Sequence, residues 1–140
     1  MADTPRTWAI LQALQIRLKT IRVVNDYRTA AGADVRLEPS QLGAAPRITL
    51  YTAATTRPDD ARAPGEREFT LIVEAQVPVA LENAHQLAVA IAEDIEQALD
   101  TYAPMPLALP LQYQEALFLD RPDGVAAMAA QLMFVTRFRR

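Results

Sequence analysis

Residues 69–79, FTLIVEAQVPV, constrain the fold most, because apolar and polar side chains alternate along nearly the whole run. Only Ile72 interrupts the polar row. A period of two predicts a strand with one face in a hydrophobic core, and such a strand needs partners in a sheet. The apolar positions are Phe69, Leu71, Val73, Ala75, Val77 and Val79.

Four further segments have the composition of strands. Residues 47–53 and 35–37 alternate in the same way, and residues 111–119 and 126–138 flank DRPDG, whose Asp123-Gly124 pair favours a hairpin turn. Within NDYRTAAGADV we expect a short strand at 27–29 and a positive φ at Gly32, so that residues 25–35 form a small hairpin leading into the sheet. Residues 39–46 are expected to be a loop.

Two segments have helical periodicity. Thr4 and Pro5 suit the N-cap and first position of a helix over residues 5–21, which Asn25 and Asp26 would close. Residues 81–99 change to the same period, with Val89 and Ala90 giving a second, weakly apolar face. The expected buried stripes are Trp8, Leu11, Leu14, Leu18 and Ile21 in the first helix and Ala84, Leu87, Ala88, Ile91, Ile95 and Ala98 in the second.

This order of elements predicts an α+β fold, a mostly antiparallel sheet of about four to six strands with two helices packed on one face. The 140 residues suit one domain, 1–140, that buries its core without metal or disulfide, and cysteine is absent. A polar, charged loop at about 54–68 joins two of the strands. A loop of that length in a compact domain is usually functional or mobile.

Charge and hydropathy exclude several classes of partner. The net charge is −3, and the only basic concentration, Arg137, Arg139 and Arg140 around Phe138, is interpreted as a solvated strand end. We therefore expect no sequence-specific nucleic-acid binding. No run approaches the ~18 apolar residues of a membrane span, and the first ten residues do not resemble a signal peptide.

Groups that could support catalysis do not converge in the sequence. The four glycines are too scattered for a phosphate loop, and the single histidine, His85, is expected to pack or cap rather than bind metal. The acids Asp59 and Asp60, and the helical acids Glu93, Asp94 and Glu96, are interpreted as solvated charge. We expect no enzyme, no cofactor and no metal. An enzyme using His85 with a carboxylate is the weaker alternative, tested by loss of activity in His85→Ala.

The chain instead offers surfaces for contact: the charged loop, an apolar helix face and sheet edges. An uncovered edge invites another strand, so the expectation is a symmetric homo-oligomer, with an ordinary monomer as the alternative.

Several stretches together resemble the tail terminator and tail completion proteins of long-tailed bacteriophages. They are WAILQALQIRLKTI, NDYRTAAGADV, the P-RITLY strand, FTLIVEAQVPV and AHQLAVAIAEDIEQAL, which cover nearly the whole chain in order. The likeness is sharpest at DYRTAAG, which is close to an aromatic-x-Thr-x-x-Gly pattern.

The resemblance implies a virion protein at the neck-proximal end of the tail, assembled in the host cytoplasm. It would form a ring, typically hexameric, that caps the tail tube, ends elongation and presents a face to the head connector or neck protein. The loop at 57–68 would reach a neighbour or the tube. The other reading is a small α+β module that holds an apolar ligand between helix and sheet. As interface residues we predict Arg57, Asp59, Asp60, Arg62, Glu66, Arg67, Arg28 and Val89.

Overall fold

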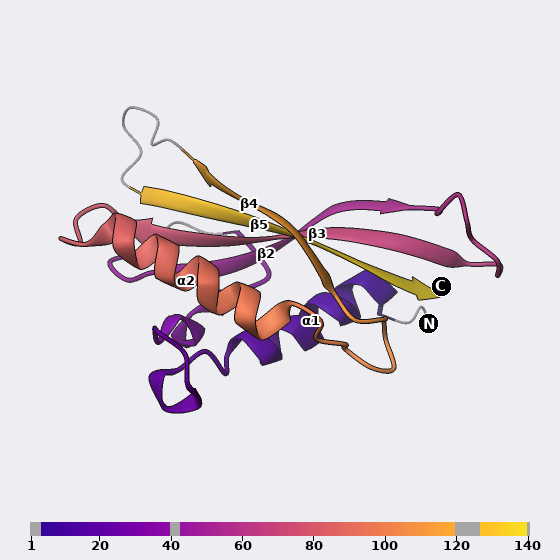
Figure 1. Cartoon of the computed structure of the whole chain (residues 1–140), viewed down its shortest axis with the longest axis horizontal. Coiled ribbons are helices and arrows are strands. Elements are labelled where there is room, and N and C mark those ends of the chain that lie inside the picture. Colours follow the sequence, from indigo (N-terminus) through magenta and orange to yellow (C-terminus); the bar gives the residue numbers. More distant parts are fainter. Residues whose placement is uncertain (1–3, 40–42, 120–126, 140) are drawn as a thin grey trace.

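The computed structural model describes residues 4–39, 43–119 and 127–139. Helices and strands follow one another along the chain, and in space the helices form one layer and the strands another (Figure 1). In chain order the elements are α1 (Arg6–Leu18), the 3₁₀ turns η1 (Val23–Asn25) and η2 (Ala31–Ala33), β1 (Val35–Arg36), β2 (Arg47–Thr56), β3 (Glu66–Pro78), α2 (Ala84–Leu99), β4 (Gln112–Leu119) and β5 (Ala127–Arg139).

The five strands of the described residues form one sheet in the order β1-β2-β3-β5-β4. All neighbours pair antiparallel except β1 and β2, which are parallel. Both helices lie on one side of this sheet (Figure 1). The predicted α+β fold, its mostly antiparallel sheet and the placement of its helices are confirmed.

The core lies between the helices and the alternating face of β3. Phe69, Leu71, Val73, Ala75 and Val77 are fully buried, as the period of two predicts, whereas Val79 lies in the turn after the strand. The predicted helical stripes are buried too, with Trp8 and Leu87 partly so. Fully buried partners from the rest of the fold are Ile48, Leu50, Ala130, Leu132 and Phe134.

The first helix starts one residue later than predicted. Pro5 occupies the N-cap, where no side chain caps the helix, and Thr4 lies outside it. The helix also ends at Leu18 instead of residue 21, and Asn25 and Asp26 close the η1 turn, with Asp26 in the left-handed region at φ 67°. A shift of one or two residues is usual at helix ends, and the three-residue difference at the C-terminal end is larger because residues 19–20 form a turn.

The predicted hairpin over residues 25–35 is wrong. Residues 27–29 are not a strand, and Gly32 lies inside η2, where its N–H donates to the carbonyl of Ile21 at 3.0 Å. A Cβ at Gly32 would lie 2.7 Å from the carbonyl oxygens of both Leu18 and Lys19. Close backbone approach, rather than a positive φ, is therefore what requires glycine here.

The loop predicted at 54–68 is shorter than expected. β2 runs through Thr56 and β3 begins at Glu66, with Thr56 opposite Glu68, so only residues 57–65 connect them. Among the described residues, the glycine with a positive φ is Gly65, at 78°. The tip of this long hairpin extends beyond both helices (Figure 1).

The predicted pairing of the last two strands is confirmed. β4 and β5 are antiparallel, with an irregularity between Tyr113 and Glu115. The predicted turn at 123–124 and part of the expected 39–46 loop lie outside the described residues. Within the described ranges, no helix is long and apolar enough to cross a membrane.

Candidate assembly interface

The hairpin tip is fixed to the end of β5 by one guanidinium group. Arg137 contacts the carboxylates of Asp60 at 3.0 Å, Glu66 at 3.5 Å and Glu68 at 3.6 Å. Arg137 belongs to the run interpreted from the sequence as a solvated strand end; its side chain is 33% exposed at the surface, and it is ion-paired as well. Its neighbour Phe138 is buried and packs edge-on against Phe69, with the ring centroids 6.3 Å apart.

The same contact shifts the pKa of both partners. The hydrogen bond from Arg137, together with its charge, holds the pKa of the Asp60 carboxyl below its ordinary value. The hydrogen bond to Asp60 raises the pKa of Arg137 in turn. Both groups therefore stay charged at neutral pH, and the tip is held by an ion pair on the molecular surface.

The other predicted residues at the tip differ in their solvent exposure and in their hydrogen bonds. Arg57, Asp59 and Arg62 are exposed, and the backbone N–H of Arg62 donates to Glu66 at 3.1 Å. Arg67 is half-buried and donates to the carbonyl of Glu66 at 2.8 Å. The tip thus presents exposed charges of both signs on a backbone held by Glu66 and Arg137.

Arg28, predicted as a packing or inter-subunit contact, binds within its own chain. Its Nη1 contacts the Asp94 carboxylate at 3.1 Å, and its backbone N–H donates to the same oxygen at 3.0 Å. The backbone N–H and the hydroxyl of Thr29 both donate to the other Asp94 oxygen at 2.8 Å. Arg28 also lies 3.4 Å from Glu93. Its side chain is half exposed, so it remains available to a partner as well.

Asp94 was predicted to be solvated, and this is wrong because its side chain is fully buried. Its helical position carried the signal: residues 91, 94, 95 and 98 follow the spacing of one buried stripe. A carboxylate on that stripe needs donors, and the segment 28–29 supplies them.

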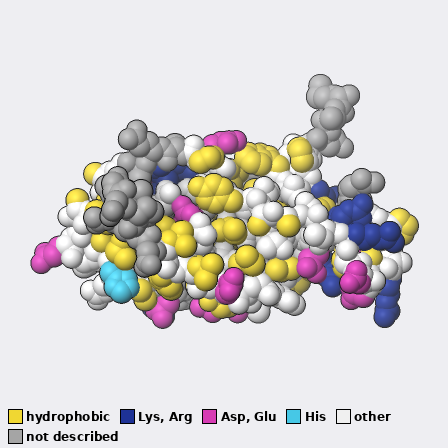
Figure 2. All heavy atoms as spheres, turned by 90° about the horizontal axis from the view of Figure 1, so that it is seen from above, with side chains coloured by type: hydrophobic (Ala, Val, Ile, Leu, Met, Phe, Trp, Pro, Cys, Tyr) yellow, Lys and Arg dark blue, Asp and Glu magenta, His cyan; other side chains and the backbone are white. Residues whose placement is uncertain are grey.

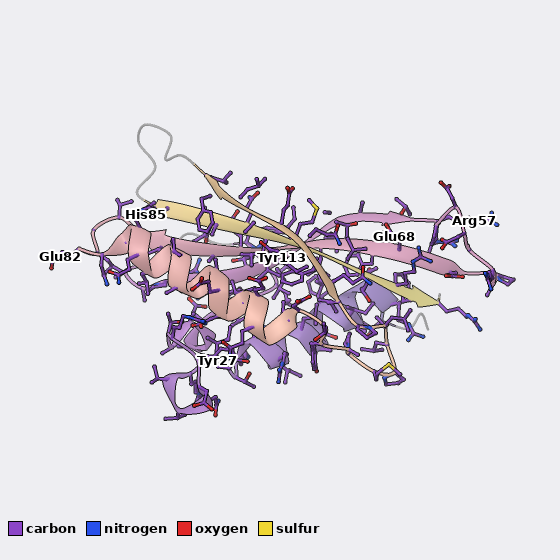
Figure 3. The ribbon with its side chains drawn as sticks, in the orientation of Figure 1. Tyr27, Arg57, Glu68, Glu82, His85 and Tyr113 are labelled. Atoms are coloured by element: carbon purple, nitrogen blue, oxygen red, sulfur yellow. The ribbon has the colours of Figure 1, made fainter. Side chains whose placement is uncertain are left out.

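The remaining predicted groups lie far apart. Figure 3 places Glu82 and His85 at the opposite end of the molecule from Arg57 and Glu68. His85 is exposed at the start of α2, and Val89 on the same helix is 37% exposed. Across residues 4–39, 43–119 and 127–139, no three His, Cys, Asp or Glu side chains form a group that could hold a metal ion.

The sheet face away from the helices has partly buried side chains of mixed character. Figure 2, which views the molecule from above, shows apolar side chains along its middle and basic side chains gathered at the end where the β2–β3 hairpin lies. On this face the buried Glu74 accepts hydrogen bonds from Gln76 and Gln131, both at 2.7 Å. Burial, then the charge of Glu74, raises the pKa of the Tyr51 hydroxyl.

Besides the charged tip, two exposed apolar surfaces stand out. Leu117, Phe118 and Leu119 are 49%, 48% and 41% exposed at the end of β4, the outermost strand of the sheet. A surface hollow of about 280 Å³ lies between residues 105–109 and the end of β5, lined by Met105 and Leu109 among others. These surfaces were not named as sites from the sequence, although the edge strands were expected.

Comparison with solved structures gives a full-length likeness of fold. A chain of the virion of a native gene transfer agent (GTA) particle superposes with a TM-score of 0.66, covering 95% of this chain and 99% of that one. The two sequences are 17% identical, so the likeness concerns the fold alone. A second solved chain, 13% identical, reaches a TM-score of 0.44, too low to support an argument. No family model matches the sequence, and no curated protein does.

Proposed function

We propose that residues 1–140 form one assembling domain of a phage or phage-like virion, with a structural and not an enzymatic role. The observation that carries this proposal is the end-to-end fold likeness to a chain of a GTA virion. The finer proposal follows from the sequence resemblance to tail terminator and tail completion proteins. The chain forms a ring, which we expect to be hexameric, that caps the tail tube at its neck-proximal end.

In this role the ring ends tube elongation and offers a surface to the head connector or neck protein. The long β2–β3 hairpin supports the proposal, because its tip carries exposed charges beyond the helices, where a neighbouring subunit or tube protein could meet them. Arg57, Asp59 and Arg62 are the residues we assign to that contact, with Asp60, Glu66 and Arg67 shaping the tip. Arg28 and Val89 are assigned to secondary contacts on the α2 side.

The alternative, a module holding an apolar ligand between helix and sheet, finds no specific support. The side chains at that interface, including Phe69, Phe134, Ile91 and Ile95, are fully buried in one core cluster. The apolar hollow described above lies at the surface instead.

The decisive experiment mixes the purified protein with the tail tube protein of the same particle. Light scattering and negative-stain imaging should show rings, free or on tube ends, and tubes assembled with the protein present should be shorter. Tubes assembled without it provide the baseline. A protein that stays monomeric at every concentration and never binds tube ends would contradict the proposal.

A further inference from the structure

The sheet has two free edges whose directions are compatible. Each of the pairs β2–β3, β3–β5 and β5–β4 is antiparallel, so β2 and β4 run in opposite directions at the two sides of one sheet. The strand β4 of one copy, placed beside β2 of a second copy, would therefore continue the antiparallel alternation without a break.

Both edges are open in the described part of the chain. β1 pairs only with Ile48 and Thr49 of β2, leaving residues 50–56 without a strand on that side. On β4, the N–H of Tyr113 is covered by the Asp100 carboxylate at 3.2 Å, and the exposed run 117–119 follows with neither proline nor charge. Natural edge strands usually carry such protection, and an edge without it is a template for another strand.

The two edges are similar in length, and each contains one irregularity. β4 has 8 residues, and the free part of β2, residues 50–56, has seven. Each strand has one irregularity, between Thr52 and Ala54 in β2 and between Tyr113 and Glu115 in β4. Residues paired across two strands must point to the same face of the sheet.

That requirement limits the registers to those that differ by one pair on the same face. Leu117 and Leu119 share the face of Gln131 and Ala129, while Tyr51 and Ala54 share the face of Ile72 and Thr70, which is the side away from the helices. One register that matches the faces places Leu119 opposite Tyr51 and Leu117 opposite Ala54. Apolar side chains then meet apolar ones, as cross-strand pairs favour.

Charge favours the same register. Continuing it brings Arg57, just beyond β2, beside Tyr113 of the neighbour, where Asp100 and Glu96 lie close and Glu115 follows. Opposite charges at a contact both steer association and fix its alignment. The chain thus carries an acidic edge on one side of its sheet and a cation at the matching place on the other.

We infer that copies of this chain join through β4 of one and the free edge of β2 of the next, which makes the sheet continuous from subunit to subunit. The contact is heterologous, so it generates a closed ring where the rotation closes. Because β1 already pairs with the start of β2, the β4 strand of the neighbour must pair further along β2. Each subunit is therefore shifted along the strand direction relative to the one before it, and a closed sheet requires such a stagger. This inference rests on the proposed function, since it names the surface by which the ring forms.

Disulfide trapping tests the inference directly, because the protein has no cysteine of its own. The double variant Leu117→Cys, Ala54→Cys places one thiol on each edge. Within one chain these positions are three strand spacings apart, about 14 Å. A disulfide needs Cα atoms within about 7 Å, so any that forms must join two copies.

Under mild oxidation the double variant should give a ladder of covalent multimers that ends at the ring size. Each single variant should give no cross-link, and a mixture of the two singles should give dimers only. Leu117→Cys with Thr55→Cys is the matched control, since Thr55 points to the helix side and should cross-link several-fold less. Pairing Leu117→Cys with Tyr51→Cys or Thr56→Cys tests registers shifted by one pair. Thermal melting should show every variant folded, because the positions chosen are at least partly exposed.

Dimers from the single variant Leu117→Cys would overturn the inference by showing a β4–β4 contact. So would rings of the unmodified protein, seen by light scattering or on tube ends, combined with no cross-link in any of the three registers. In that second result the proposed function survives. An unmodified protein that never assembles defeats both.

Discussion

Asp94 is the side chain that fixes the segment between α1 and the sheet. It is fully buried in α2 and accepts from both backbone N–H groups of residues 28–29 and from the Thr29 hydroxyl. Buried carboxylates are tolerated only when such donors surround them. One residue therefore holds a segment that has no strand or long helix of its own.

Replacing Asp94 by alanine should remove about 3 kcal/mol from the free energy of unfolding, because it leaves the donors of residues 28–29 unsatisfied in the interior. Urea denaturation measures this. Thr29→Val should cost less, about 1 kcal/mol, since it removes a single hydroxyl. Glu93→Ala, an exposed neighbour, is the control and should change stability by no more than about 0.5 kcal/mol. Equal losses for Asp94→Ala and Glu93→Ala would contradict this account.

Gly32 gives a second prediction at a single residue. Gly32→Ala should destabilise the fold by about 1–3 kcal/mol, because the new methyl meets three backbone carbonyl oxygens at 2.7–2.9 Å and these cannot move aside easily. Gly43→Ala is the matched control, since nothing lies within 4 Å of its added Cβ. Thermal melting of both variants checks the difference, and similar melting temperatures would show the prediction wrong.

These two residues show what the sequence could and could not predict at this scale. The pattern aromatic-x-Thr-x-x-Gly was visible, and it corresponds to Thr29 on Asp94 and Gly32 against the helix end. Its geometry was not predictable, because the partner of Thr29 lies 65 residues away in the chain. The charge of Asp94 led to the prediction that its side chain is exposed to solvent, whereas its position on the buried stripe of the helix indicated the core.

Among the elements, the parallel pair β1–β2 depends on Asp34. Its carboxylate accepts from Arg36 at 2.8 Å and from the buried Arg47 at 3.2 Å, and its carbonyl accepts from Ile48 at 2.9 Å. Burial alone would raise the pKa of Asp34, but the hydrogen bonds and charges of the two arginines outweigh it and lower the pKa.

A pKa lowered by folding stabilises the protein above the unfolded pKa, and that stability is lost as the pH falls through the folded value. Asp34→Asn should therefore lower the free energy of unfolding at pH 7. The difference from the wild type should shrink as the pH falls from about 5 toward 2. Denaturation at a series of pH values measures it, and a difference independent of pH would contradict the assigned role.

The hairpin tip gives a prediction about motion. Arg137→Gln removes the charge that binds Asp60, Glu66 and Glu68, so backbone amides in residues 57–65 should exchange hydrogen faster. Overall stability should change little, because the pair lies on the surface. Hydrogen exchange with mass spectrometry checks this, with Arg62→Gln as a tip control. Unchanged exchange at the tip would show that the ion pairs do not hold it.

Strands and helices with clear periodicity were predictable, and the ends of the β2–β3 hairpin were not. Residues 54–56 are small and residues 66–68 are all charged, so neither segment has the alternation that marks a half-buried strand. They are strands because β3 pairs along its whole length with β5, from Glu66 opposite Arg139 onward. Backbone pairing, which side-chain patterns do not report, extends the sheet there.

For the molecule as a whole, we expect that the hairpin tip can be removed without unfolding the domain. Replacing residues 58–64 by Asn-Gly should leave a folded domain, since all strand pairs and the Glu66 and Glu68 contacts remain. The variant should lose the ability to cap tubes, because the exposed charges Asp59 and Arg62 are gone. Circular dichroism tests folding, and tube length tests capping. Normal capping by this variant would show that the loop is only a connector.

The two sides of the sheet differ in a way that matters for anything enclosed by copies of it. Helices cover one side, and the other presents Thr70, Ile72, Gln131 and Met133 around a carboxylate held by two amides. In an annulus with its helices outward, this second side would be the wall of the bore. A polyanion threaded through the bore would meet hydroxyls, thioethers and a carboxylate along the middle of this side and the guanidinium groups of Arg137 and Arg139 at one end of it, so salt-dependent adhesion would be confined to that end.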